Sequence, residues 1–104
     1  AIHKSYKALV TGSLKFLLAQ PKLIAYGRFN EEEAVTIVIN NDYSDRHVKL
    51  HVRELGVHNN RTMKRLMLTT ESGYSLDDQA FVVQNNVLSV VVPKMSAAIY
   101  YCKL

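Results

Sequence analysis

The sequence is poor in the residues that build disulfides, cysteine-rich metal sites and rigid turns. Its 104 residues include no tryptophan, one cysteine, two prolines and four glycines. The single cysteine, Cys102, excludes an internal disulfide and a metal site made of several cysteines. Because Cys102 stands among apolar residues near the end of an expected strand, we expect a buried, unreactive thiol. The chain also lacks the Cys–Trp–Cys core of many immunoglobulin-like domains.

Long apolar runs and clustered charge are absent as well. No apolar run approaches the roughly 20 residues that cross a membrane, so no membrane partner is expected. Thirteen basic and nine acidic residues give a net charge of +4, and the basic residues are scattered along the chain. A nucleic-acid partner is therefore not expected. With 48% hydrophobic and 21% charged residues, the composition is that of one globular domain, residues 1–104.

The clearest pattern lies at residues 23–41, where two apolar runs flank a polar turn. β-Branched and aromatic residues bounded by Asn, Asp and Glu predict two strands joined by that turn. Alternation in the second strand predicts that Val35, Ile37 and Ile39 face the core. Thr36 and Val38 would then lie on the other side.

Further short strands are expected on both sides of this hairpin. Asn85 and Asn86 suit a two-residue hairpin turn, because Asn tolerates positive φ. About eight or nine strands predict an all-β fold, an antiparallel β-sandwich of Greek-key type, with a barrel as the alternative. The additional strands are expected at residues 14–19, 48–53, 63–70, 80–83, 87–92 and 96–102, with loops at 56–62 and 71–78.

Residues 1–12 predict a short helical tail. Ile2, Tyr6 and Leu9 fall at i, i+4 and i+7, one face of a helix, and Gly12 marks its end. The segment is too short to form a stable helix alone, so we expect the remnant of a preceding helix and its linker. The first residue is not methionine, which leaves the compartment open; a cytoplasmic location is expected over a secreted one.

Four passages, taken in order, resemble a known family. They are residues 3–14, the run LIAYGR at 23–28, the run VTIVINN at 35–41, and the run VVVPKMSAAI at 90–99. Together the chain resembles the C-terminal β-sandwich domain of the α-amylase superfamily of glycoside hydrolases, closest to the neopullulanase, cyclomaltodextrinase and oligo-glucosidase group. His3 stands where that family usually has Arg, and Lys94 replaces a common second Pro.

The resemblance implies a sandwich packed against a catalytic (β/α) barrel of the same parent chain, an α-glycosidase. The family's catalytic carboxylates belong to regions outside this chain, so no catalytic residue is carried over and the chain alone is not expected to be an enzyme. The expected role is an accessory domain that stabilises the barrel. The alternatives are a module that tethers the enzyme to α-glucan and an unrelated immunoglobulin-like interaction module.

The residues themselves indicate no catalytic, cofactor or metal site. His47 and His51 would lie about 13 Å apart on a strand, too far to share one ion. Glycoside hydrolysis needs two carboxyl groups facing each other across a cleft, one of them held protonated. The acidic residues at 31–33 and 77–78 instead lie side by side in polar turns.

Aromatic residues divide into two expected groups. Tyr43 and Tyr74, in expected loops, are the only pair suited to stacking on a sugar. Those in expected strands predict core or interdomain packing: Phe16, Tyr26, Phe29, Phe81, Tyr100 and Tyr101. Ile2, Tyr6, Leu9 and Phe16 are the expected contacts to the missing domain. A chain with such a surface is also expected to self-associate weakly.

Overall fold

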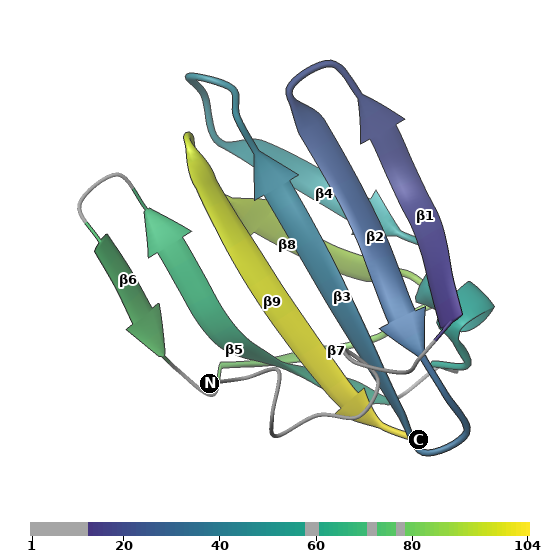
Figure 1. The fold of residues 1–104 in the computed structure, drawn as a ribbon. Helices are drawn as coiled ribbons and strands as arrows, with labels where there is room; N and C mark the ends of the chain where they lie inside the picture. The colour runs from purple at the N-terminus through teal and green to yellow at the C-terminus, as the bar shows by residue number, and fades with distance from the viewer. Residues whose placement is uncertain (1–12, 58–60, 71–72, 77–78) are drawn as a thin grey trace.

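The structure, a computed structural model, describes residues 13–57, 61–70, 73–76 and 79–104. These residues form nine strands and one short 3-10 helix, so the predicted all-β fold is confirmed (Figure 1). No helix among them is long and apolar enough to cross a membrane. The predicted helical tail lies outside the described residues. The elements are β1 (Ser13–Gln20), β2 (Leu23–Phe29), β3 (Glu33–Asn40), β4 (Arg46–Leu50), η1 (Val52–Leu55), β5 (Thr62–Thr70), β6 (Gly73–Leu76), β7 (Ala80–Val82), β8 (Leu88–Val92) and β9 (Ser96–Lys103).

The strands form two antiparallel layers, as predicted for a sandwich. The large sheet has the order β1-β2-β3-β9-β5-β6, and β7 also pairs with β5. The small sheet consists of β4 and β8 and lies behind the large one in Figure 1. The last strand, β9, lies between β3 and β5, so strands far apart in the sequence are neighbours at the centre of the large sheet.

Two predicted boundaries are wrong. The strand predicted at 48–53 ends at Leu50, because the chain turns into η1, which buries Val52 and Leu55 at a spacing of three residues. Gly56, with a φ of 90°, ends that helix. The loop predicted at 71–78 contains β6, whose Gly- and Ser-rich sequence becomes a strand by pairing with β5.

The predicted turn at Asn85 and Asn86 is confirmed. Both residues have positive φ, 53° and 64°. Gln84 and Val87 exchange backbone hydrogen bonds of 3.1 and 2.9 Å across the turn. This pattern is the two-residue turn whose twist matches that of the flanking strands.

The predicted core face of β3 is wrong. Val38 belongs to the main core between the sheets and Thr36 is fully buried, whereas Val35, Ile37 and Ile39 lie on the opposite side of β3. Both sets are apolar or small, so the alternation of the sequence alone does not show which set faces the other sheet. The main core also contains buried side chains from the small sheet and from η1, including Val48, Leu50, Val52, Leu55, Leu88, Val90 and Val92.

Gly27 lets η1 pack against the large sheet. A Cβ atom on Gly27 would lie 2.3 and 2.7 Å from the two Cδ atoms of Leu55, which is fully buried. We therefore expect Gly27→Ala to lower the free energy of unfolding by about 1–3 kcal/mol through overpacking. Urea unfolding measures this loss. In the double variant with Leu55→Ala the two losses should be less than additive, because the second change removes the atoms that clash. A Gly27→Ala protein as stable as the parent would contradict this contact.

Candidate functional site

The outer face of the large sheet, the side turned away from β4 and β8, carries a row of apolar side chains across five strands. Phe16, Tyr26, Ile37, Ile99 and Met67 are direct cross-strand neighbours in the order β1, β2, β3, β9, β5. Directly paired residues project on the same side of a sheet. With strands about 4.8 Å apart, this Ile37 row spans roughly 19 Å.

A second row continues the apolar surface toward the end of β3. It consists of Ala19, Ile24, Ile39, Ala97 and Thr69, again as direct neighbours across the same five strands. Neither this Ile39 row nor the Ile37 row contains a charged residue. The two rows together form a continuous uncharged surface across most of the sheet.

A third row, on the other side of the Ile37 row, brings charge to the outer face. This Val35 row consists of Leu14, Arg28, Val35, Tyr101 and Lys64, across the same strands. Val35 is fully buried, and Ile37, Ile99 and Tyr101 pack around it. The outer face therefore has a packed apolar centre of its own, with cations at its border.

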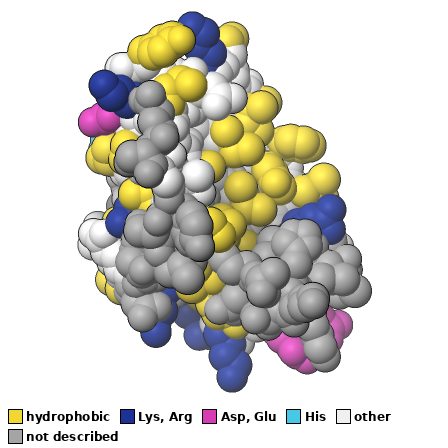
Figure 2. All heavy atoms as spheres, turned by 60° about the vertical axis from the view of Figure 1, so that its left-hand side comes forward, with side chains coloured by type: hydrophobic (Ala, Val, Ile, Leu, Met, Phe, Trp, Pro, Cys, Tyr) yellow, Lys and Arg dark blue, Asp and Glu magenta, His cyan; other side chains and the backbone are white. Residues whose placement is uncertain are grey.

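Several apolar side chains of the outer face remain open to solvent. Phe16 is 62% exposed, Leu14 50% and Ile24 39%. The ring of Phe16 lies 6.0 Å from that of Tyr26, centroid to centroid. Figure 2, turned so that the β6 edge comes forward, shows hydrophobic side chains gathered together on the surface. Single exposed apolar residues are ordinary, but a contiguous group marks a surface that another structure covers.

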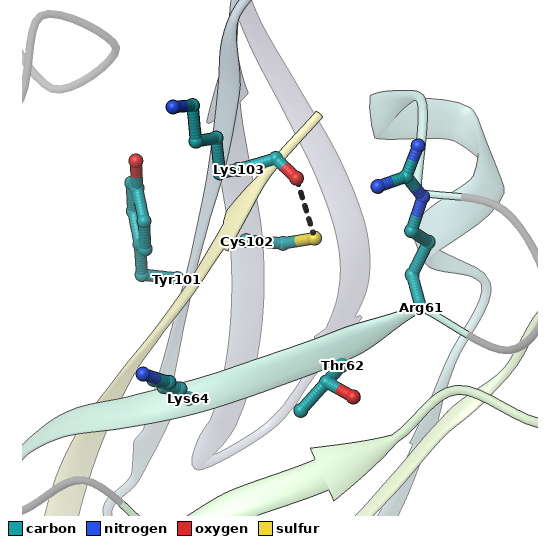
Figure 3. Close-up of a pocket in the computed structure, with 6 residues that line it drawn as sticks. All are labelled: Arg61, Thr62, Lys64, Tyr101, Cys102 and Lys103. Carbon is teal, nitrogen blue, oxygen red and sulfur yellow. Dashed lines mark hydrogen bonds between the residues drawn. The ribbon is translucent and has the colours of Figure 1, made fainter.

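A pocket of about 330 Å³ lies beside the Val35 row, where β5 begins and β9 ends (Figure 3). Tyr101 is shared between the pocket and the outer face, and its hydroxyl donates to Glu33 Oε2 at 2.9 Å. Burial raises the pKa of the Cys102 thiol, and the nearby Arg61 guanidinium lowers it by a smaller amount. A thiol with a raised pKa is a poor nucleophile at neutral pH. The lining residues are Arg61, Thr62, Lys64, Tyr101, Cys102 and Lys103.

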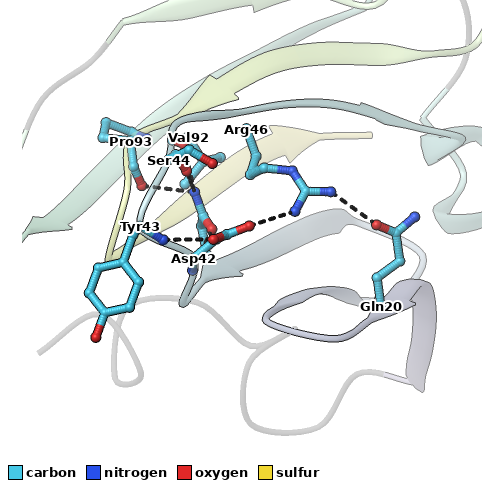
Figure 4. Close-up of polar contacts among 8 residues, drawn as sticks. Gln20, Asp42, Tyr43, Ser44, Arg46, Val92 and Pro93 are labelled. Atoms are coloured by element: carbon cyan, nitrogen blue, oxygen red, sulfur yellow. Dashed lines mark hydrogen bonds and ion pairs between the residues drawn. The ribbon is translucent and has the colours of Figure 1, made fainter.

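The loop after β3 is fixed by the side chain of Asn40, which is fully buried. Its amide nitrogen, Nδ2, donates to the carbonyl oxygens of Ser44, Val92 and Pro93 at 3.1, 3.0 and 3.1 Å. Its Oδ1 accepts from the backbone N–H of Asp42 at 2.9 Å. One amide therefore ties the loop to the end of β8 (Figure 4).

Further contacts hold the same loop from its outer side. The Arg46 guanidinium forms an ion pair with Asp42 at 3.1 Å and donates to Gln20 Oε1 at 3.2 Å. Tyr43, at the tip, is 78% exposed, and Lys22 Nζ lies 6.0 Å from its ring centroid. Figure 4 shows the Tyr43 ring pointing away from the hydrogen-bonded residues. A single aromatic ring thus projects from a well-anchored loop.

The residues predicted for sugar stacking lie on different elements. Tyr43 follows β3, and Tyr74 is in β6, where its backbone pairs with Thr69. Three spacings between strands separate β3 from β6, roughly 14 Å. Of the residues predicted to contact another domain, Phe16 lies on the outer face. Ile2, Tyr6 and Leu9 lie outside the described residues.

The residues considered for metal or acid chemistry are dispersed. His47 is exposed on β4 and shares a 2.7 Å hydrogen bond with Ser89, while His51 is exposed just before η1. Glu31 and Glu32 are exposed in the β2–β3 turn, and Asp77 and Asp78 lie outside the described residues. The described part of the chain contains no group of three or more His, Cys, Asp or Glu suited to a metal ion.

No protein-family model matches the chain. Solved structures share its fold. An α-amylase from Geobacillus thermoleovorans aligns with 99% of the chain at a TM-score of 0.79 and 17% identity, over 21% of its own length. A debranching enzyme from Nostoc punctiforme aligns with 95% of the chain at a TM-score of 0.64 and 24% identity, over 19% of its own length. A GH30 endoxylanase from Clostridium papyrosolvens aligns with 88% of the chain at a TM-score of 0.70 and 13% identity, over 24% of its own length.

The chain has the fold of a part of α-amylases. This match confirms, at the level of the fold, the resemblance carried by the sequence. The chain spans about a fifth of the length of the α-amylase and of the debranching enzyme. Because a xylanase shares the fold, the fold by itself selects no substrate.

Proposed function

We propose that this chain is a non-catalytic accessory domain of an α-glucan-acting glycoside hydrolase, and that its outer face packs against the catalytic barrel of the same polypeptide. The observation that carries the proposal is the uncharged surface formed by the Ile37 and Ile39 rows. The chain aligns with about a fifth of an α-amylase. In a longer polypeptide of that kind, part of the remaining four fifths would cover this uncharged surface.

Packing of this kind stabilises both partners. Removing an apolar side chain of the size of Phe16 from water contributes up to about 2 kcal/mol. Any structure that binds the folded domain and not the unfolded chain raises the apparent stability of that domain. In the accessory role the domain thus stabilises the catalytic barrel and fixes the orientation of the two domains, and it carries out no reaction itself.

No described carboxyl group is buried, whereas glycoside hydrolysis needs one that an apolar pocket holds protonated. Glu33, the acidic residue on the outer face, accepts a hydrogen bond from Tyr101. Glu54 forms an ion pair with Lys15, and Asp42 with Arg46. We therefore place the catalytic acids in the barrel and expect this chain alone to release no sugar from α-glucans.

The test uses the longer polypeptide with a specific protease site inserted between this chain and the rest. After cleavage of the folded protein, sedimentation velocity at about 10 µM should show both parts moving as one complex, the range in which standard interfaces bind. The separated chain should unfold at a lower temperature than it does in the complex. Parts that sediment independently after cleavage would remove the physical basis of the accessory role.

A tethering role for glucan is the second candidate, and the exposed Tyr43 ring on its anchored loop is the observation that favours it. An aromatic ring that is already held in place stacks on a sugar at low cost in conformational entropy. The same cleaved preparations separate the two roles. A tethering module would carry the isolated chain onto insoluble amylose, and Tyr43→Ala would release it. The accessory role predicts retention of neither protein.

A further inference from the structure

One end of the outer face, named here the border, carries three cations, Arg28, Lys64 and Lys103, that form no ion pair with another described residue. Arg28 and Lys64 belong to the Val35 row, and Lys103, two residues after Tyr101, projects on the same side. The ion pairs Lys15–Glu54 and Arg46–Asp42 of the described residues lie elsewhere and involve none of these three cations. Lys64 and Lys103 are exposed, and both line the pocket.

Glu31, Glu32 and Glu33 lie at the same end of the sheet, and among the described residues none of them forms an ion pair with Arg28, Lys64 or Lys103. Glu33 is the cross-strand neighbour of Lys103, and its Oε2 accepts the Tyr101 hydroxyl. Among the described residues, the pocket lining holds three cations, Arg61, Lys64 and Lys103, and no carboxylate. In Figure 3, Tyr101 and the Lys103 side chain lie on one side of β9, Arg61 lies on the other, and Lys64 lies on the neighbouring strand β5.

We propose that the part of the catalytic domain that packs on this face carries carboxylate side chains opposite Lys64 and Lys103, and that one of them enters the pocket. This inference rests on the proposed function and names the chemistry of its partner surface. A volume of about 330 Å³ accommodates the side chain of an Asp or Glu. The lysine ammonium groups and the Thr62 hydroxyl supply donors to its oxygens.

Charge at this border would fix the relative orientation of the two domains, which the apolar rows alone would not do. Apolar packing is non-directional, so the Ile37 and Ile39 rows alone tolerate several rotations of one domain against the other. Complementary charges at one end of an interface fix its orientation and disfavour wrong ones. The border therefore sets how the sandwich sits on the catalytic domain, while the apolar rows supply most of the free energy.

The test compares two double charge reversals in the cleavable longer polypeptide. Lys64→Glu with Lys103→Glu alters the border. Lys49→Glu with Arg53→Glu makes the same change of charge away from the border, because Lys49 is exposed on β4 and Arg53 is exposed in η1. After cleavage, the border variant should bind the remaining part about tenfold more weakly than the control at low salt. At about 0.5 M salt the difference should fall below about threefold, because salt screens exposed pairs.

Each result decides one of the two proposals. Equal affinities of the border variant and the control would overturn the carboxylate partner and leave the accessory role intact, provided that both still form the complex. A weakening that does not depend on salt would also overturn it, because an effect on packing would explain the loss. If the unaltered parts separate on cleavage, the accessory role itself fails. Urea unfolding of both isolated double variants checks that neither reversal unfolds the sandwich.

Discussion

Asn40→Asp is expected to lower the free energy of unfolding by about 3–5 kcal/mol at neutral pH, the cost of an uncompensated buried charge. The Asn40 amide nitrogen donates to three carbonyl oxygens at 3.0–3.1 Å. An ionised carboxylate has no donor, so the oxygen that replaces this nitrogen would face those carbonyls at the same distance. Proteins of this size are stable by about 5–15 kcal/mol, so much of the total would be lost.

The loss should depend on pH with a definite sign. Burial and the facing carbonyl oxygens would raise the pKa of Asp at this position in the folded state above its unfolded value of about 3.9. A raised folded pKa means that the folded state binds protons more tightly, so stability falls as pH rises from the unfolded pKa to the folded one. Below about pH 3.9 most of the penalty should disappear. Urea unfolding between acidic and neutral pH, with the parent protein at each pH, measures this.

Asn41→Asp is the matched control. Asn41 is the next residue along the chain, and its replacement by Asp introduces the same charge, but Asn41 is exposed. Surface substitutions of this kind change stability by less than about 0.5 kcal/mol. Similar losses in the two variants, or a loss for Asn40→Asp that is independent of pH, would contradict the role assigned to the buried amide.

The sequence predicted the strands whose ends carry strong local signals. β2, β3 and β8 end near Asn, Asp or Pro, and the turn at Asn85 and Asn86 requires the positive φ that Asn tolerates. It missed β6 because nothing local in a Gly- and Ser-rich segment favours a strand. The pairing of β6 with β5 supplies that preference, and it depends on residues elsewhere in the chain.

The candidate site was only partly predictable for a different reason. Phe16, Tyr26, Tyr100 and Tyr101 were all expected in strands, with core and interdomain packing left as alternatives. The structure separates them: Tyr100 is fully buried between the sheets, whereas the other three lie on the outer face. The side on which each ring lies follows from strand register and from the position of the second sheet, and neither is a local property of the sequence.

The run at 34–39 did contain a signal for the outer face. Its residues are apolar or small on both alternations, a pattern typical of strands that are covered on both sides. The inner alternation, Ala34, Thr36 and Val38, is covered by the small sheet. The outer alternation, Val35, Ile37 and Ile39, matches an apolar surface that the remainder of a longer polypeptide would cover.

Ile37→Glu is therefore expected to affect the isolated chain and the longer polypeptide very differently. Ile37 is half-buried at the centre of the outer face, in contact with the cluster around Val35. In the isolated chain a glutamate can turn into water, and we expect a loss of about 1 kcal/mol. Packed against a barrel, the same carboxylate would be buried without a partner at the centre of the interface, where substitutions commonly cost 2 kcal/mol or more.

Cleaved longer polypeptide carrying Ile37→Glu should thus dissociate at concentrations where the parent stays associated, with an affinity at least about 30-fold lower. Val91→Glu is the matched control, because Val91 is 55% exposed on β8, on the surface of the small sheet. It should bind as tightly as the parent. Sedimentation of both variants, with urea unfolding of each isolated chain, separates loss of docking from loss of folding. If Ile37→Glu docks as tightly as Val91→Glu, the outer face is not the interface, and the interface must lie on another surface of the sandwich.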